Sequence, residues 1–215
     1  MTTAAKVRLR FAKQGDLRLV SHHDLMRCVE RLLRRADLPV AQSQGFNPRP
    51  KVVFTLALAL GIEGRREVVE LDLTEPLGAA EVLERLRATS PAGLDWLDAE
   101  DVPPGRAAHA SAAAYVFDLP ADRAPAAAEA VERLLASDHW PYTRRRADRD
   151  DVAVDLRPFL IEAAVDPIGA LRFRMKISPN GSARPEEIVE ALGLRDLIGH
   201  GAVLVRTDLE LAPTP

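Results

Sequence analysis

The chain has 215 residues, of which 47% are hydrophobic and 28% charged, and its net charge at pH 7 is −3. This length can bury a sizeable core and suits one large domain or two small ones. No apolar run reaches the roughly 20 residues that cross a bilayer, and the basic N-terminal stretch lacks the apolar segment of a signal peptide. We therefore expect a cytoplasmic protein that makes no membrane contact.

Cys28 is the only cysteine of the chain. A single thiol excludes an internal disulfide, and it excludes a zinc or iron–sulfur site built from cysteines of this chain. We expect no metal and no cofactor here, and a cluster of that kind would have to come from a partner.

The charges are unevenly distributed along the chain. Residues 1–51 contain eleven Lys and Arg against four acidic residues, a net charge of +7, so the remainder carries −10. A basic region on an acidic body favours binding of a polyanion by that region. The alternative is that the two regions neutralise each other in the fold.

The first hundred residues show hydrophobic patterns of strands and helices in turn. The apolar residues Val7, Leu9 and Phe11 alternate with Arg8 and Arg10, which predicts a half-buried strand. Ser21 followed by Asp24 predicts a capped helix start. An apolar stripe then follows the helical period at Leu25, Cys28, Val29, Leu32, Leu33 and Ala36.

This helix ends at Asp37 to Pro39, before the Pro-rich loop QSQGFNPRPK at 42–51. The patterns further predict strands at 52–58, 69–73 and 94–99, a turn at 61–65 and a helix that opens at Pro76. The order strand, helix, strand, strand, helix, strand is that of the ferredoxin-like fold.

Residues 102–112 are rich in Pro, Ala and Gly, which predicts a linker. The same order then recurs with one strand more than a simple repeat needs. We predict helices at 125–136 and 185–192 and strands at 113–119, 142–146, 152–164, 171–177 and 202–211. The fold class is therefore α+β, with two ferredoxin-like halves of antiparallel sheet at 1–101 and 113–215, the second elaborated.

His22 and His23 lie at the first turn of the predicted helix. Adjacent histidines point to different sides of a helix, unlike the i, i+4 pair that binds zinc. A metal site with Asp24 and a distant residue is one alternative to a structural or ligand-contacting role for His22. Another is metal-independent RNA cleavage, in which His22 exchanges a proton and Arg49 or Lys51 stabilises the phosphorane-like state.

The loop from Gln44 to Lys51 combines rigidity with an aromatic and two cations. Gly45 allows an unusual backbone, and Asn47 before Pro48 favours a fixed extended turn. Phe46, Arg49 and Lys51 suit a nucleotide base and its phosphate. The alternative is that Phe46 fills the core and the cations are merely solvated.

The arginines of the predicted strand and helix have different expected roles. Arg8 and Arg10 should lie near Glu70 and Asp72 on the neighbouring strand, where cross-strand ion pairs form. The arginine-rich face of the helix, Arg27 to Arg35, is interrupted by only one acid and better suits an external anion.

Two motifs stand out in the second half. The charged run TRRRADRDD at 143–151 suggests a solvated hairpin. The motif DLRP, Asp155 to Pro158, suggests a structural or docking element in which Asp155 pairs with Arg157 or with the basic first half. The chain contains no phosphate-binding Walker loop, no dinucleotide fingerprint, no GxSxG and no zinc-finger spacing.

Three stretches, LVSHHDL at 19–25, RCVERLLRRADLP at 27–39 and SQGFNPRPKVVF at 43–54, resemble the radical-SAM-linked DUF2344 family, which occurs alone or fused behind a radical SAM domain. DLRP and SARPEEIVEALGL at 182–194 fit the second half of that family. Arg49 departs from the family pattern, which often has His there. The resemblance implies association with a radical SAM enzyme and no particular reaction. Its characteristic positions here are Ser21, His22, Asp24, Gly45, Phe46, Asn47, Pro48 and Pro50.

We therefore predict an RNA-binding accessory protein that presents tRNA or rRNA to a radical SAM partner, without catalysis by this chain. The alternatives are a metal-independent ribonuclease using His22 and a purely protein-interaction module. The predicted RNA-binding or ligand-binding residues are Ser21, His22, Asp24, Arg27, Arg31, Arg34, Gln44, Phe46, Asn47, Arg49 and Lys51.

Overall fold

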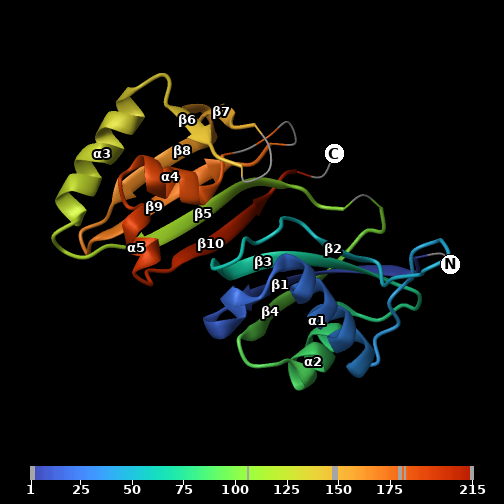
Figure 1. Ribbon diagram of the computed structural model, residues 1–215. Coiled ribbons are helices and arrows are strands. Elements are labelled where there is room, and N and C mark those ends of the chain that lie inside the picture. Colours follow the sequence, from blue (N-terminus) through green and yellow to red (C-terminus); the bar gives the residue numbers. More distant parts are fainter. Residues whose placement is uncertain (1–2, 106, 147–149, 179–180, 182, 214–215) are drawn as a thin grey trace. The chain divides into compact units, whose positions relative to one another are not determined.

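The computed structural model describes residues 3–105, 107–146, 150–178, 181 and 183–213 (Figure 1). The chain is a mixed α+β protein in which the strand pairings are mostly antiparallel. It divides into two compact units, residues 1–110 with 211–215 (unit 1) and residues 111–210 (unit 2). None of its described helices is long and apolar enough to span a membrane.

Unit 1 follows the predicted order of strands and helices. Its antiparallel strands lie in the order β4-β1-β3-β2. Both longer helices lie on the same side of this sheet (Figure 1). The elements are β1 (Ala5–Lys13), the short 3-10 helix η1 (Gly15–Leu19), α1 (His22–Arg35), β2 (Val52–Phe54), β3 (Glu63–Leu73), α2 (Ala79–Thr89) and β4 (Leu94–Val102).

The core of unit 1 joins alternate residues of β1 to the apolar stripe of α1. Val7, Leu9 and Phe11 are buried, and they pack in one cluster with the buried residues of both helices. In α1 these buried residues are Leu25, Val29, Leu32 and Leu33, whereas Cys28 is only half-buried at the margin of the stripe. The helical period in the sequence therefore identified the buried face correctly.

The predicted start of α1 is confirmed. Ser21 is the N-cap residue, and its hydroxyl oxygen accepts a hydrogen bond from the Asp24 backbone N–H at 3.2 Å. The same hydroxyl donates to Asp24 Oδ2 at 2.7 Å. Just before the helix, the buried Lys13 donates from Nζ to the Val20 carbonyl at 2.7 Å. These three hydrogen bonds fix the point at which the chain enters α1.

Several predicted boundaries in unit 1 are wrong. The strand predicted at 52–58 ends at Phe54, because an apolar run does not by itself specify an extended backbone, and within this run only Leu58 is buried. The turn predicted at 61–65 overlaps β3, which begins at Glu63. The helix predicted from Pro76 begins at Ala79, whose backbone N–H donates to Asp101 Oδ1 at 3.0 Å.

Unit 2 pairs its strands in the order β10-β5-β9-β8, and β6 and β7 form a separate antiparallel pair. β9 is antiparallel to both β5 and β8. The elements are β5 (Ala110–Asp118), α3 (Ala124–Ala136), β6 (Pro141–Arg144), β7 (Val152–Asp155), η2 (Arg157–Phe159), β8 (Leu160–Val165), β9 (Ala170–Lys176), α4 (Pro185–Ala191), α5 (Arg195–Gly199) and β10 (Leu204–Leu211).

The single strand predicted at 152–164 is wrong, because η2 divides it into β7 and β8. Pro158 lies within η2, and proline lacks the N–H that a continuous strand ladder needs. The short helix α5 was not predicted. In the charged run at 143–151, residues 147–149 lie outside the described part of the chain.

Candidate functional site

His22 is held by a row of aromatic side chains that begins in the core. Its ring lies 5.3 Å from that of Phe54 in an edge-on arrangement. Phe54 in turn meets Phe11 at 5.9 Å, and Phe11 meets Trp96 at 5.5 Å. His22 is half-buried, whereas His23 is exposed. The first turn of α1 is therefore anchored through His22.

The described residues contain no group of three or more His, Cys, Asp or Glu that could hold a metal ion. Asp24 is occupied in another way, because it receives the Ser21 hydroxyl and forms an exposed ion pair with Arg27 at 3.4 Å. Ser21 and Asp24 thus cap the helix, and their side chains are committed to each other.

The loop at 43–49 is closed at its base like a small hairpin. The Ser43 backbone N–H donates to the Arg49 carbonyl at 2.7 Å, and the Arg49 N–H donates to the Ser43 hydroxyl at 3.0 Å. One step further down, the Lys51 N–H donates to the Ala41 carbonyl at 2.7 Å. At Gly45, φ is +136°, a conformation that favours glycine. These hydrogen bonds lie at the base of the loop, and none of them involves the residues at its tip.

The tip of this loop is exposed. Phe46 is fully accessible, so the alternative in which it fills the core is wrong. Gln44, Asn47 and Arg49 are exposed as well. The Arg49 guanidinium has no hydrogen bond or ion pair with any described residue, whereas Lys51 lies 3.7 Å from Asp72. The loop therefore presents an aromatic ring and, three residues further on, a cation without a partner in the described part of the chain.

The loop and the start of α1 reach the sheet at different points of β3. Phe54, which contacts His22, pairs with Val69. The base of the loop lies at Asp72, whose backbone bonds to both Ala41 and Lys51. Three residues of strand separate these points, about 10 Å at the usual rise. Ser21 and His22 are thus set apart from the base of the loop.

The arginines of α1 border a shallow pocket of about 540 Å³. Arg31 and Arg34 are exposed, and neither guanidinium has a partner among the described residues. Arg35 donates to the Thr89 carbonyl at 3.3 Å. Arg27 does not line the pocket. The lining residues are Cys28, Arg31, Arg34, Arg35 and Pro91. We call this the α1 pocket.

The cations of β1 make contacts within the fold, and the expected cross-strand ion pair is confirmed for Arg8, whereas Arg10 lies opposite Val68 and not near Asp72. Arg8 pairs in register with Glu70, and Arg8 Nε lies 2.9 Å from Glu70 Oε1. Lys6 Nζ lies 2.7 Å from the other carboxylate oxygen. Arg10 donates to the Arg66 carbonyl at 3.4 Å. This strand therefore offers less positive charge to a ligand than its sequence suggests.

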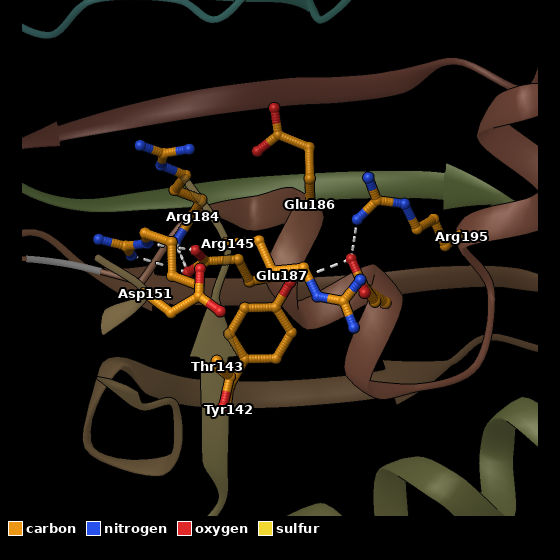
Figure 2. Close-up of a pocket in the computed structure, with 10 residues that line it drawn as sticks. Tyr142, Thr143, Arg145, Asp151, Arg184, Glu186, Glu187 and Arg195 are labelled. Atoms are coloured by element: carbon orange, nitrogen blue, oxygen red, sulfur yellow. Dashed lines mark hydrogen bonds and ion pairs between the residues drawn. The ribbon is translucent and has the colours of Figure 1, made fainter. Parts of the chain in front are cut away.

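Unit 2 contains a larger pocket, of about 800 Å³, that was not predicted from the sequence (Figure 2). Four arginines and four acidic residues border it, so its formal charges balance. The lining residues are Tyr142, Thr143, Arg144, Arg145, Asp151, Arg184, Glu186, Glu187, Glu190 and Arg195.

Two ion pairs organise the unit 2 pocket. Glu187 is buried and takes two bonds from the Arg144 guanidinium and one from the Arg184 backbone N–H. Burial works to raise the pKa of Glu187, but Arg144 and the backbone donor outweigh it and hold that pKa below its usual value. Glu190 accepts hydrogen bonds from both the Tyr142 hydroxyl and Arg195. Burial, then Glu190, raises the pKa of Tyr142.

The DLRP motif ties together the segments that surround it. Asp155 accepts from the backbone N–H groups of Trp140 and Arg157 and lies 2.7 Å from His139 Nδ1. The Arg157 guanidinium donates instead to the carbonyls of Leu135, Ser137 and Leu160. Arg157 thereby satisfies carbonyls at the end of α3, which would otherwise lack partners.

These features define a mixed α+β protein. Unit 1 has an exposed aromatic loop and arginines that lack partners among the residues that the structure describes, and unit 2 has a charge-balanced pocket. Comparison with known families adds one assignment. The chain belongs to the family described as an uncharacterized protein conserved in bacteria (DUF2344), whose profile matches residues 6–185. A search of curated proteins found no match.

Proposed function

We propose that this protein binds single-stranded or looped RNA through unit 1, and that it acts in the cytoplasm as an accessory to a radical SAM enzyme that modifies or processes tRNA or rRNA. We also propose that both units are ferredoxin-like folds, the second elaborated by the β6–β7 hairpin. The strand order β4-β1-β3-β2 and its counterpart β10-β5-β9-β8 support this assignment.

One observation carries the RNA-binding proposal: Phe46 is fully exposed on a loop that is closed without it. Exposing a phenylalanine ring to water is unfavourable, so a ring held outside the core is suited to a partner surface. Unpaired bases of RNA stack on such rings, whatever their sequence. Arg49, which has no partner among the described residues, lies three residues further along the same loop and would bind phosphate.

The partner enzyme is proposed from the family resemblance alone. The chain has one cysteine, whereas a radical SAM enzyme binds its iron–sulfur cluster through three. The radical chemistry would therefore belong to the partner, and this protein would hold the substrate. The ribonuclease alternative has less support, because His22 contacts Phe54, which pairs with Val69, whereas the loop that carries Arg49 reaches β3 at Asp72.

Binding of a fluorescent single-stranded RNA, followed by anisotropy from roughly 50 to 200 mM salt, tests the proposal. We expect affinity to fall steeply with salt, and Arg49→Gln to reduce the slope of log K against log salt by about 0.7, the contribution of one phosphate contact. Arg133→Gln is the matched control, since Arg133 is exposed on α3 and pairs only loosely with Glu129. No binding at low salt would contradict the proposal.

A further inference from the structure

The α1 pocket differs from the unit 2 pocket in its balance of charge. Three of its five lining residues are arginines and none is acidic. In the unit 2 pocket, by contrast, the lining contains as many acidic residues as arginines. A pocket of uncompensated guanidiniums favours an anion, because no carboxylate of the protein competes for them.

The helix spacing explains why these arginines converge. Arg31 and Arg34 follow Cys28 at three-residue intervals, and Arg35 lies four residues beyond Arg31, so all four side chains share one face of α1. Pro91, which follows α2, closes the other side. Arg35 is held in place through the Thr89 carbonyl. A fixed guanidinium loses little further entropy when it binds a ligand.

Two of the three guanidiniums remain available. Arg31 and Arg34 have no hydrogen bond or ion pair to described residues, and both are exposed. Glu30, their nearest acid along the helix, does not line the pocket. The site can therefore compensate more than one negative charge.

We infer that the α1 pocket binds a terminal phosphate monoester of the RNA, an inference that rests on the proposed RNA binding. A diester within the RNA backbone carries one negative charge, whereas a monoester carries about −1.5 to −2 at pH 7 and offers three acceptor oxygens. Three arginines match the charge of the phosphate monoester better than that of the diester. The pocket would thus recognise an RNA end, while the Phe46 loop contacts unpaired bases.

The lone cysteine supplies a direct readout. Cys28 lines the pocket and is half-buried, so a bound phosphate should slow its alkylation by iodoacetamide. The experiment compares one RNA oligonucleotide in three forms, with a 5′ phosphate, with a 3′ phosphate and with hydroxyls at both ends. Inorganic phosphate is a fourth ligand. Binding and Cys28 alkylation are measured on the full chain.

We expect one phosphorylated form to bind about tenfold more tightly than the hydroxyl form, as charge-assisted hydrogen bonds worth about 1.4 kcal/mol would give, and to protect Cys28. The double variant Arg31→Gln/Arg34→Gln should lose this preference and this protection, while Arg133→Gln on α3 keeps both. Circular dichroism of each variant verifies that the fold is retained.

The possible failures are distinguishable. If all three RNAs bind equally and leave Cys28 equally reactive, the terminal-phosphate inference is wrong although RNA binding stands. If no RNA binds but inorganic phosphate protects Cys28 only when Arg31 and Arg34 are present, the anion pocket is supported and RNA is the wrong source of the phosphate. If nothing binds or protects, both proposals fail.

Discussion

The Lys6 ammonium lies 2.7 Å from a Glu70 carboxylate oxygen, and the two side chains are only 3% and 1% exposed. Arg8 bonds to the second oxygen at 2.9 Å, and the Ala108 backbone N–H donates at 3.2 Å. Burial works to raise the pKa of Glu70, but the bonds from Lys6 and Arg8 lower it overall. A charged group can be buried at this depth because its hydrogen-bonding capacity is satisfied.

Glu70→Gln should therefore destabilise the protein by about 3–5 kcal/mol, because it removes the buried carboxylate that pairs with Lys6 and Arg8. Urea unfolding at pH 7 measures the loss. Glu100→Gln is the control, since Glu100 also bonds to Arg8 but is 61% exposed, and its cost should stay below about 1 kcal/mol. Equal effects of the two substitutions would refute a special role for burial.

Acid should weaken unit 2 through Glu187. The pKa of Glu187 in the folded protein lies below its ordinary value of 4.5, so the unfolded chain binds the proton more readily. The stabilisation is complete above pH 4.5 and is lost as the pH falls through the lower folded pKa. Glu187→Gln should remove this dependence.

The measurement for Glu187 is the difference in unfolding free energy between wild type and Glu187→Gln from neutral pH down to about pH 3. We expect about 3–5 kcal/mol at neutral pH, as for a broken buried pair, shrinking toward acid. Glu186→Gln is the control, because Glu186 lies next to Glu187 and is less buried. A difference that is constant with pH would overturn this assignment.

Loss of the α1 cap should be measurable on its own. Ser21→Ala removes the acceptor of the Asp24 N–H, which typically costs about 0.5–2 kcal/mol. Ser21→Thr keeps a hydroxyl and should restore most of the stability. Thermal unfolding of both variants decides whether the hydroxyl or merely the size of the side chain matters.

Phe46→Ala should separate binding from stability. Since the ring is fully exposed, the unfolding free energy should change by less than about 0.5 kcal/mol. RNA affinity should fall by about 1–3 kcal/mol, the usual loss when one stacked base loses its aromatic platform. Ile168→Ala, at a residue 85% exposed in unit 2, should change neither quantity. A large loss of stability in Phe46→Ala would show that the ring packs in the fold.

Gly93 and Gly61 form a matched pair for a test of steric contact. Both have positive φ, +82° and +85°, so an alanine is strained at either position. At Gly93 the new methyl carbon would also lie 2.7 Å from the Gln14 carbonyl oxygen, whereas at Gly61 it meets nothing within 4 Å. Gly93→Ala should therefore cost more than Gly61→Ala in urea unfolding, by about 1 kcal/mol or more.

The sequence predicted correctly those features that depend on residues close together in the chain or on the expected pairing of strands. The Ser21 cap and the buried stripe of α1 follow from spacing, and the nearness of Arg8 to Glu70 follows from the expected pairing of the first and third strands; the structure has all three. For Phe46 the sequence allowed either burial or exposure, because the choice depends on how the loop closes at Ser43. The ligand-binding roles of the loop and the α1 arginines stay predictions.

The unit 2 pocket could not be predicted because its partners are far apart in the chain. Tyr142 and Arg144 meet Glu190 and Glu187, which lie 48 and 43 residues away. One usable signal was present: residues two apart on a strand point to the same side, as do residues three apart on a helix. Only the packing of α4 against the hairpin brings the two faces into contact.

The segment after β4 determines where a fragment that represents unit 1 should end. Gly105 accepts a hydrogen bond from Lys6, and Ala108 donates one to Glu70, so this stretch, expected to be a linker, supplies hydrogen-bond partners to the buried charged residues of unit 1. Truncation at Asp101 would remove the backbone N–H that donates to Glu70 and the carbonyl that accepts from Lys6. A fragment meant to represent unit 1 in isolation should extend at least to Ala110. Protease cleavage before Ala110 should therefore destabilise unit 1.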